Sequence, residues 1–215
     1  MPKLLDPVAG GESQRGGSGP ADPERDRLIA AFGKAASEHG YRDLTVDQVA
    51  RYAGTSRARI EAHFGTKEQG LVAAQDAFLE RLWLDVLDAC EAVEDWPVKV
   101  RAALRSVIAS LVEASALARV FAVEATAASF AAAERQLAIL DGFANMLRGG
   151  RQLYPAASAL PSITERAMVG GIASIISGYL LAEEPQALST LEPDLVELIL
   201  IPYIGPDQAH RIAHA

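Results

Sequence analysis

The stretch TVDQVARYAGTSRARIEAHF, residues 45–64, decides the fold because it has the pattern of two short helices joined by a tight turn. Thr45 with Gln48 forms a capping box at the start of the first helix, and Ser56 can cap the second after the break at Gly54-Thr55. The apolar positions that would hold the two helices together recur at helical spacing: Val46, Val49, Ala50, Ala53, Ile60 and Phe64. The stretch therefore predicts a helix-turn-helix, a motif whose second helix enters the major groove in proteins that bind DNA.

Two arginines, Arg57 and Arg59, stand in the first turn of the second helix, outside the apolar stripe. An arginine there can donate to both O6 and N7 of a guanine, and a good pair is worth roughly 1–3 kcal/mol of discrimination. Many small helical hairpins share this spacing without binding DNA, and their arginines are simply solvated. From spacing alone both interpretations stay open.

The segments on either side are also helical. Asp22 and Pro23 are residue types preferred at a helix N-terminus, and Gly40 is the type preferred just past a helix end. A second capping box, Thr66 with Gln69, opens a long helix. Beyond it the pattern predicts helices at about 98–114, 117–131, 133–150, 162–183 and 187–204, about nine in all, and no strand. The sequence therefore predicts an all-α fold.

Composition and charge set limits on the function. The chain has 215 residues, of which 50% are hydrophobic and 22% charged, and its net charge is −8. These proportions are those of a globular protein. The excess of acidic residues lies entirely beyond residue 70, since residues 21–70 hold eight basic and eight acidic side chains. The charge therefore neither predicts nor excludes a DNA-binding head.

The single cysteine, Cys90, excludes a disulfide framework and a thiolate metal cage. The longest charge-free apolar run, residues 167–182, is shorter than the roughly 20 residues that a membrane-spanning helix needs. No secretion signal is evident at the N-terminus. We therefore expect a cytoplasmic protein that makes no membrane contact.

Six short motifs between residues 27 and 71 fall in one register: His39-Gly40-Tyr41, Thr45-Val46, Val49-Ala50, Ala53-Gly54-Thr55-Ser56, His63-Phe64 and Lys67-Glu68. On these motifs, residues 27–71 resemble the N-terminal domain of the tetracycline-repressor (TetR) family of transcriptional regulators. The resemblance implies a three-helix helix-turn-helix domain at 22–68 and a helical effector-binding and dimerisation domain at 69–215. The glycine-rich segment before them, 1–21, has no apolar pattern and is expected to be a disordered arm.

The resemblance also implies which residues contact DNA. Thr45 would contact a phosphate from a helix N-terminus, where free amides and the helix dipole favour an anion. Ser56, Arg57 and Ala58 would form the tip of the recognition helix, and His63 and Lys67 would hold the DNA backbone. The full set of expected DNA-contacting residues is Thr45, Thr55, Ser56, Arg57, Ala58, Arg59, Glu61, His63 and Lys67.

Glu61 and Gly70 are among the residues that depart from the family pattern. Glu61 stands where an aromatic residue is usual, and its charge would lie near phosphates. It could accept from cytosine N4, pair with Arg57 one turn earlier, or weaken DNA binding. Gly70 replaces a large apolar residue, at a helix cost of about 1 kcal/mol relative to alanine.

The C-terminal part carries a pattern for self-association. The run 195–201 is apolar nearly all round, so its helix must be covered on more than one side. The helix before it is rich in small residues that permit close approach of another helix. We expect a four-helix homodimer interface that includes Gly171, Ser174, Ile175, Gly178, Leu195, Leu198 and Ile199. The alternative is a monomer in which both helices are buried, whereas a two-fold dimer predicts a palindromic operator.

An effector pocket is expected among the helices that follow the DNA-binding head. The large or polar residues available to line it are Trp83, Phe121, Glu124, Phe130, Phe143, Met146 and Met168. Each of them could equally be ordinary core packing. Glu124 is a carboxylate among apolar neighbours, and it could face solvent or bind a ligand. The apolar lining favours a hydrophobic or amphipathic small molecule.

The chemistry of an enzyme is not evident in the sequence. His210 and His214 lie one turn apart, a spacing that can chelate a metal, but no third ligand is evident, so we expect no metal and no cofactor. No phosphate-binding glycine loop, nucleophile elbow or catalytic carboxylate pair is found. Cys90 follows an apolar helical run and is expected to be packing.

We therefore expect a ligand-responsive transcriptional regulator rather than an enzyme. It would be a repressor that binds a palindromic double-stranded DNA operator as a homodimer and is released by a small hydrophobic or amphipathic effector. The alternative is a helical ligand- or protein-binding module whose DNA-binding head is weakened or lost. Glu61 and the neutral head motivate this alternative.

Overall fold

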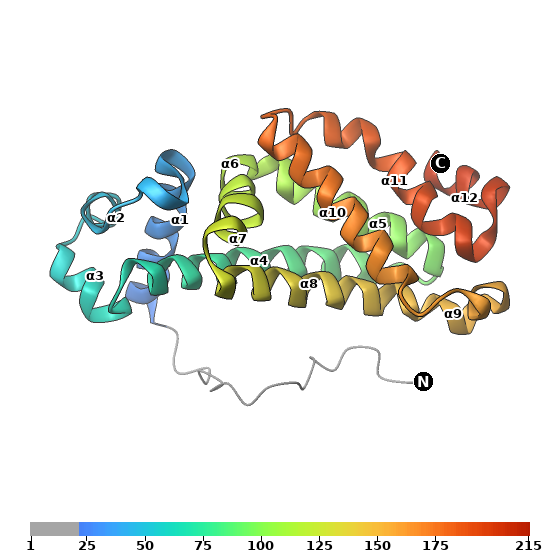
Figure 1. Cartoon of the computed structure of the whole chain (residues 1–215), viewed down its shortest axis with the longest axis horizontal. Helices are drawn as coiled ribbons and strands as arrows, with labels where there is room; N and C mark the ends of the chain where they lie inside the picture. Colours follow the sequence, from blue (N-terminus) through green and yellow to red (C-terminus); the bar gives the residue numbers. More distant parts are fainter. Residues whose placement is uncertain (1–21) are drawn as a thin grey trace.

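A computed structural model describes residues 22–215, and within this range every regular element is a helix (Figure 1). The predicted all-α fold is therefore confirmed. The expected arm, 1–21, lies outside the described residues.

The head is formed by the first three helices and the start of the fourth. Their bounds are α1 (Pro23–Asp43), α2 (Val46–Ala53), α3 (Arg57–Phe64) and α4 (Lys67–Glu91). Side chains cap each of them as the sequence predicts: Asp22 on α1, Thr45 on α2, Ser56 on α3 and Thr66 on α4. The turn between α2 and α3 places Gly54 in the left-handed region, with φ of 61°, which suits a residue without a side chain. The predicted helix-turn-helix is thus present.

Gly70 lies in the first turns of α4, where α4 crosses α1. A Cβ atom at this position would overlap the ring of Phe32, which is fully buried and packs edge-to-face on Phe64 with 5.3 Å between ring centroids. The large aromatic residue on α1 therefore occupies the space that a side chain at position 70 would need. This explains the departure that sequence reasoning could only describe as a helix cost.

We expect Gly70→Ala to destabilise the protein by about 1–3 kcal/mol, because the ring of Phe32 must move within a close-packed core. Gly33→Ala is the matched control, since a Cβ there would meet the methyl groups of Leu117 at an ordinary 3.8 Å and should gain helix propensity. Urea unfolding measures both changes. If Phe32→Leu does not relieve the cost of Gly70→Ala in a double-mutant cycle, the overlap is not its cause.

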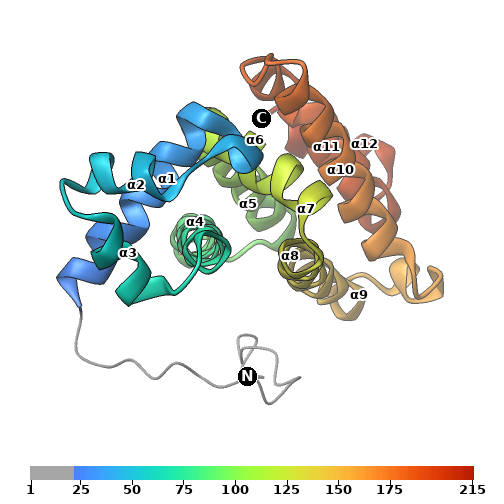
Figure 2. The same cartoon turned by 60° about the vertical axis from the view of Figure 1, so that its left-hand side comes forward.

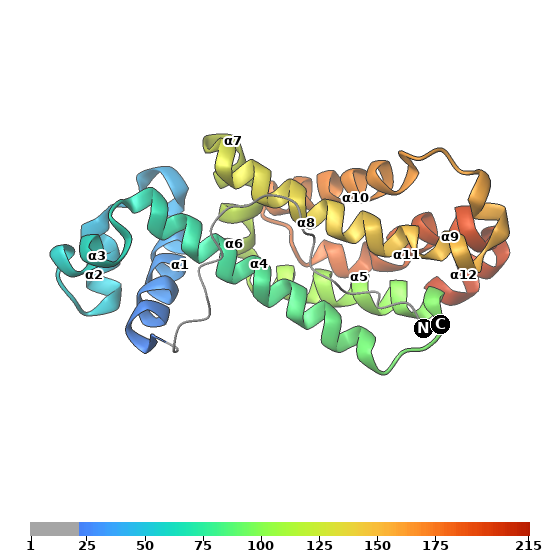
Figure 3. The ribbon, with the colours of Figure 1, turned by 90° about the horizontal axis from the view of Figure 1, so that it is seen from below.

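The body is built along α4, which continues from the head along the other long helices (Figures 1 and 3). These helices are α5 (Trp96–Glu113), α8 (Phe130–Arg148), α10 (Thr164–Leu181) and α11 (Ala187–Ile204). Seen nearly end-on in Figure 2, α4 and α8 lie side by side, with the head on one side and α10 to α12 on the other. The buried apolar residues form one cluster in the head and a second in the body.

Three regions differ from the helices predicted by periodicity. The expected helix 117–131 consists of α6 (Ser115–Arg119), a π-helical turn η1 (Val120–Glu124) and α7 (Ala125–Ala128), and Ser129 then caps α8. The connection to α10 contains α9 (Gly150–Leu153) and a 3₁₀ turn η2 (Pro155–Ala159). A further helix, α12 (Pro206–Ala213), follows the break at Gly205. Periodicity did not detect these elements because each is shorter than the window that reveals it.

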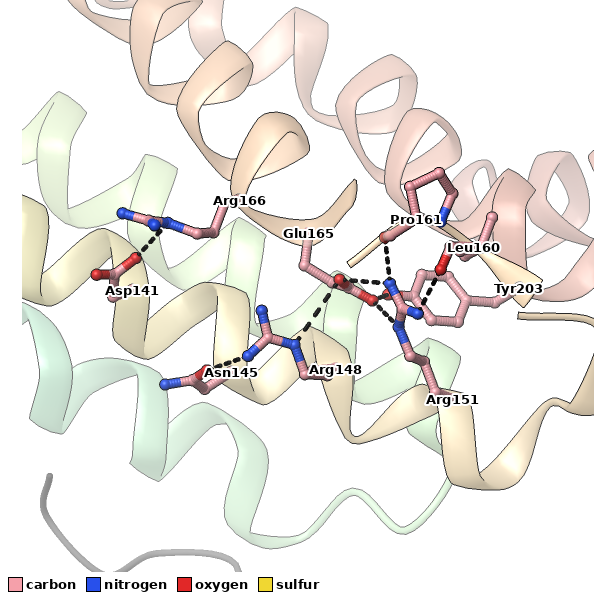
Figure 4. A network of polar contacts seen from close by, with 9 residues as sticks. All are labelled: Asp141, Asn145, Arg148, Arg151, Leu160, Pro161, Glu165, Arg166 and Tyr203. Carbon is pink, nitrogen blue, oxygen red and sulfur yellow. Dashed lines mark hydrogen bonds and ion pairs between the residues drawn. The ribbon is translucent and has the colours of Figure 1, made fainter. Parts of the chain in front are cut away.

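A buried carboxylate connects several elements at the end of the body that lies away from the head. Glu165 at the start of α10 is fully buried, and Arg151 on α9 donates to both of its oxygens at 2.6 and 2.8 Å (Figure 4). Tyr203 on α11 donates to the same carboxylate at 3.0 Å. Arg151 also donates to the carbonyls of Leu160 and Pro161. One ion pair therefore connects α9, α10, α11 and the loop that follows η2.

Among residues 22–215, no single helix has the length and apolar composition of a membrane span. The segments 96–113 and 115–128 reach that composition only as a pair, and they are bent by 100° at the break between them.

Candidate DNA-binding surface and ligand cavity

The expected DNA-contacting residues lie at the N-cap of α2, in the turn between α2 and α3, on α3 and at the first residue of α4. The exposed first turn of α3 follows the capping residue Ser56 and consists of Arg57, Ala58 and Arg59. Thr45 and Glu61 are exposed, whereas Thr55, His63 and Lys67 are half-buried. Lys67 donates from Nζ to the carbonyl of Arg42 at 3.3 Å. The fold thus gathers the predicted set at one end of the molecule (Figure 1).

Both arginines at the tip of α3 are engaged by carboxylates. Arg57 donates from Nε to Glu61 at 2.7 Å, the pairing that was one of three alternatives for this residue, and its Nη1 lies 3.9 Å from Asp47. Arg59 donates to both oxygens of Glu24 on α1, at 2.7 and 2.5 Å. DNA would have to replace these partners. Exposed ion pairs are weak and screened by salt, so the exchange is feasible.

The pairing also fixes the charge of the groups involved. The hydrogen bond from Arg59 lowers the pKa of Glu24, so this carboxyl stays ionised beside the recognition helix. The hydrogen bond to Glu61 raises the pKa of Arg57 further above its already high value. Glu24 was not predicted as part of the site, because it lies 35 residues before Arg59 and no local pattern joins them.

A cavity of about 1140 Å³ lies in the body between α4, α5, α8 and α10. Its walls are mainly aliphatic and aromatic, and they include Leu82, Leu104, Leu140, Phe143 and Ile172. The charged residues in its lining come from α4 and α5: Arg81, Asp85, Asp88, Glu91 and Lys99. Their acidic members outnumber the basic ones. The cavity can therefore bury a long apolar group and meets a mixed, slightly acidic set of charges along α4.

The structure corrects most of the predicted pocket residues. Phe143 and Met146 line the cavity, but the other five residues do not. Phe121 is fully buried in the head cluster, and Phe130 is 80% exposed at the start of α8. Trp83 packs on Phe143 and Met168 packs on the body cluster, and neither of them is part of the lining. A helical pattern shows that a face is apolar but not which cavity or core that face meets.

Glu124 has a different role from the one expected. Its Oε2 accepts from the backbone N–H of Tyr41 at 2.8 Å, and its Oε1 accepts from Arg119 at 2.6 Å. Tyr41 follows Gly40, whose φ of 76° bends the end of α1 away from a regular helix. Glu124 therefore joins the end of α1 to the body.

The π-helical turn that carries Glu124 touches both parts of the molecule. Val120 and Phe121 are buried in the head cluster, whereas Ala122 lines the cavity. Helices α6 and η1 also contact α1 and α10. Turns of this kind are rare and often lie at functional sites. We call η1 with its Glu124–Tyr41 hydrogen bond the head–body junction.

The predicted dimer interface divides into two groups. Gly171, Ser174, Ile175, Gly178 and Leu198 are exposed on α10 and α11. A Cβ added at Gly171 or Gly178 would meet nothing within 4 Å. Leu195 and Ile199 are only 4% and 5% exposed, which corrects their assignment, because they face the core of the same protomer. The exposed face is continued by Leu181 and Ile201.

The comparisons with known proteins agree with this organisation. Residues 28–74 match the family model described as bacterial regulatory proteins, tetR family. The match confirms the resemblance predicted for the head. A comparison with curated protein sequences gives no match.

Several solved structures share the fold over most of the chain. The fatty acid degradation regulator FadR from Bacillus halodurans is 19% identical, with a TM-score of 0.71 over 81% of this chain and 97% of that one. The transcriptional regulator FadR from Bacillus subtilis, in complex with stearoyl-CoA, is 22% identical, with a TM-score of 0.65 over 81% and 96%. A putative TetR-family regulator from Rhodococcus sp. is 18% identical, with a TM-score of 0.67 over 83% and 100%. These are transcriptional regulators rather than enzymes.

Proposed function

Because this chain carries the DNA-binding domain of the tetR family of bacterial regulatory proteins on a fold shared with transcriptional regulators, we propose that it is a ligand-responsive repressor. It binds a palindromic operator as a homodimer and leaves DNA when an amphipathic molecule fills the cavity. The observation that carries the proposal is the head–body junction, since one turn, η1, contributes to both the head core and the cavity wall.

Operator recognition is assigned to the first turn of α3. Arg57 and Arg59 are exposed there and can exchange their carboxylate partners for guanine edges and phosphates. Lys67 and Thr45 stand at helix N-termini beside the tip and suit phosphate contacts. The second recognition helix comes from a partner that packs on the exposed face of α10 and α11. The two recognition helices of the dimer then contact two half-sites of one duplex.

The effector is assigned from the shape and chemistry of the cavity. Its volume and aliphatic walls suit a molecule with a long hydrocarbon part. The Bacillus subtilis neighbour, whose fold is similar, was solved with stearoyl-CoA. The acidic residues along α4 favour an effector whose polar end carries less negative charge than coenzyme A.

The first experiment is recovery of genomic fragments by the purified protein, followed by sequencing. A short list of sites that share one palindrome supports a dimeric regulator. No enrichment at low salt, from protein shown to be folded, would argue against the DNA-binding part of the proposal. The cavity is tested separately by displacement of a fluorescent apolar dye with stearoyl-CoA, stearate and a long-chain alkylammonium. Repulsion by the acidic residues of the lining is expected to decrease in that order.

Arg57→Ala and Lys67→Ala are expected to differ in kind. Loss of Arg57 should relax the preference at one base position of the operator and leave binding to unrelated DNA nearly unchanged. Loss of Lys67 should weaken binding to all sequences and make the slope of log K against log salt shallower by about 1. Binding titrations on operator and scrambled duplexes at several salt concentrations measure both. Unchanged base preference in Arg57→Ala would remove this residue from sequence recognition.

The alternative, a ligand- or protein-binding module with a weakened head, is favoured by one observation. Both arginines of the recognition turn are held by carboxylates, Glu61 and Glu24. Under this alternative, Glu61→Gln would not create measurable, salt-dependent binding to any genomic fragment. A DNA-binding head should instead bind more tightly after this substitution, because a negative charge near phosphates is removed.

A further inference from the structure

Three metal-ligating side chains outside the head and the cavity converge between α11 and α12. His210 on α12 and His214, the residue that follows the end of α12, lie one turn apart, and Glu197 on α11 faces both of them. Glu197 Oε2 lies 3.0 Å from His210 Nδ1 and 3.5 Å from His214 Nε2. The sequence shows only the histidine pair, and the fold brings in the carboxylate as the third ligand.

The separations between these atoms suit a small divalent cation. Zinc binds imidazole nitrogen and carboxylate oxygen at about 2.0–2.2 Å, so two of its ligands at a tetrahedral angle lie roughly 3.3 Å apart. The two distances from Glu197 to the imidazole nitrogens, 3.0 and 3.5 Å, lie on either side of this separation. All three ligand atoms are within 4.8 Å of one another, so small rotations of the imidazole rings complete the geometry.

The site is reachable from solvent and joins two helices. The side chains of His210 and His214 are 63% and 40% exposed, whereas Glu197 is 25% exposed and fixed on a long helix. The set of two histidines and one carboxylate matches zinc sites that hold a fourth position for water. A cation here would link α12 to α11 directly.

A cation bound at these three side chains would act on the last helix, α12. Helix α12 begins after a positive-φ glycine, Gly205, and packs through the buried Ala209 and Ala213. Arg101 on α5 already holds its end, donating to the carbonyls of Ile212 and Ala215 at 2.9 and 2.7 Å. We propose that Glu197, His210 and His214 form a zinc site that fixes α12 on the body.

The test uses the full chain without an oligohistidine tag, titrated with zinc against a chromophoric chelator. One zinc per chain is expected, and Co²⁺ in its place should give the visible absorption of a low-coordinate ion. His210→Ala, His214→Ala and Glu197→Gln should each weaken binding by about 100-fold or more, since even residues that only support a ligand cost 10–100-fold. His39→Ala is the matched control, because it removes a histidine that packs on Tyr52 in the head.

A second readout reports the structural effect. With zinc at about one hundred times its Kd, the Tm of the wild type and of His39→Ala should rise by roughly 5 °C or more. Amide exchange in residues 206–213 should slow, and the three site variants should show neither change. The proposal is overturned if the wild type does not bind zinc. It is also overturned if His210→Ala and His214→Ala bind zinc as tightly as the wild type.

Discussion

Arg151→Met is expected to lower the Tm by roughly 10 °C, the largest loss of stability that we expect from one substitution. The physical reason is the environment of Glu165. Its carboxylate is fully buried, and Arg151 supplies a two-pronged guanidinium contact. Tyr203 remains after the substitution but carries no charge. The nearest other cation among the described residues is Arg148, whose Nε lies 3.9 Å from Glu165 Oε2. Breaking a buried pair by removing one partner leaves an uncompensated charge. Thermal unfolding followed by circular dichroism measures the change.

The control for this prediction removes both partners. In Arg151→Met/Glu165→Leu no buried charge is left unpaired, and much of the lost stability should return. A substitution of an exposed pair, Arg166→Met beside Asp141, should change the Tm little, because exposed ion pairs contribute little. If Arg151→Met proves as mild as Arg166→Met, the network of Figure 4 is not a major source of stability.

The same network gives the protein a defined response to acid. Burial alone would raise the pKa of Glu165, but hydrogen bonds from Arg151, its own backbone amide and Tyr203 outweigh burial, and the pKa is lowered below 4.5. The unfolded chain therefore takes up this proton at a higher pH than the folded chain. The contribution of Glu165 to stability is complete when the pH lies above the ordinary glutamate pKa of 4.5. It is lost as the pH falls through the lower pKa of the folded state. The pH dependence of unfolding should lose this component in Glu165→Gln.

The head was predictable from the sequence because its signals are local. Capping boxes, the left-handed Gly54 and the apolar stripe all act within one or two helical turns, and each is found where the pattern indicates. The reason for Gly70 was not predictable, because it depends on a ring from another helix 38 positions earlier. Similarly, Glu24 reaches Arg59 only after α1 has packed beside α3.

The body was predictable as a set of helices but not in its functional faces. Leu195 and Leu198 lie on one apolar helix, yet the first is buried within the protomer and the second is exposed. Periodicity identifies apolar surface and cannot say whether a core, a cavity or a partner covers it. The π-helical turn was invisible for a related reason, since its five residues have the composition of an ordinary helix. Glu124 was therefore noticed for its chemistry, but its partners, Tyr41 and Arg119, were not predicted.

Glu124→Ala is expected to uncouple the cavity from the DNA-binding head. The backbone N–H of Tyr41 would lose its acceptor and Arg119 its partner, and a buried amide without a partner costs about 1–3 kcal/mol. The amide of Tyr41 should then exchange with solvent much faster, while the amides of α3 keep their protection. Hydrogen exchange read by mass spectrometry or NMR measures this directly.

The functional consequence follows from the junction between the two parts. A cavity ligand can release DNA only if it prefers one position of the head over another, and that preference must pass through contacts such as Glu124–Tyr41. Coupling between two sites typically changes an affinity 5- to 150-fold. In Glu124→Ala the amphiphile that displaces the dye should still bind, but the ratio of operator Kd with and without it should fall toward one.

Two controls make this result specific. Glu113→Ala removes an exposed acid from α5, and it should leave the coupling ratio unchanged. Glu124→Gln keeps an oxygen that can accept from Tyr41 but loses the charge that pairs with Arg119, so it should retain part of the coupling. A full coupling ratio in Glu124→Ala, together with a Tyr41 amide that exchanges faster, would show that the signal reaches the head through the apolar contacts of Val120 and Phe121 instead. The hydrogen bond would then serve only to hold the end of α1.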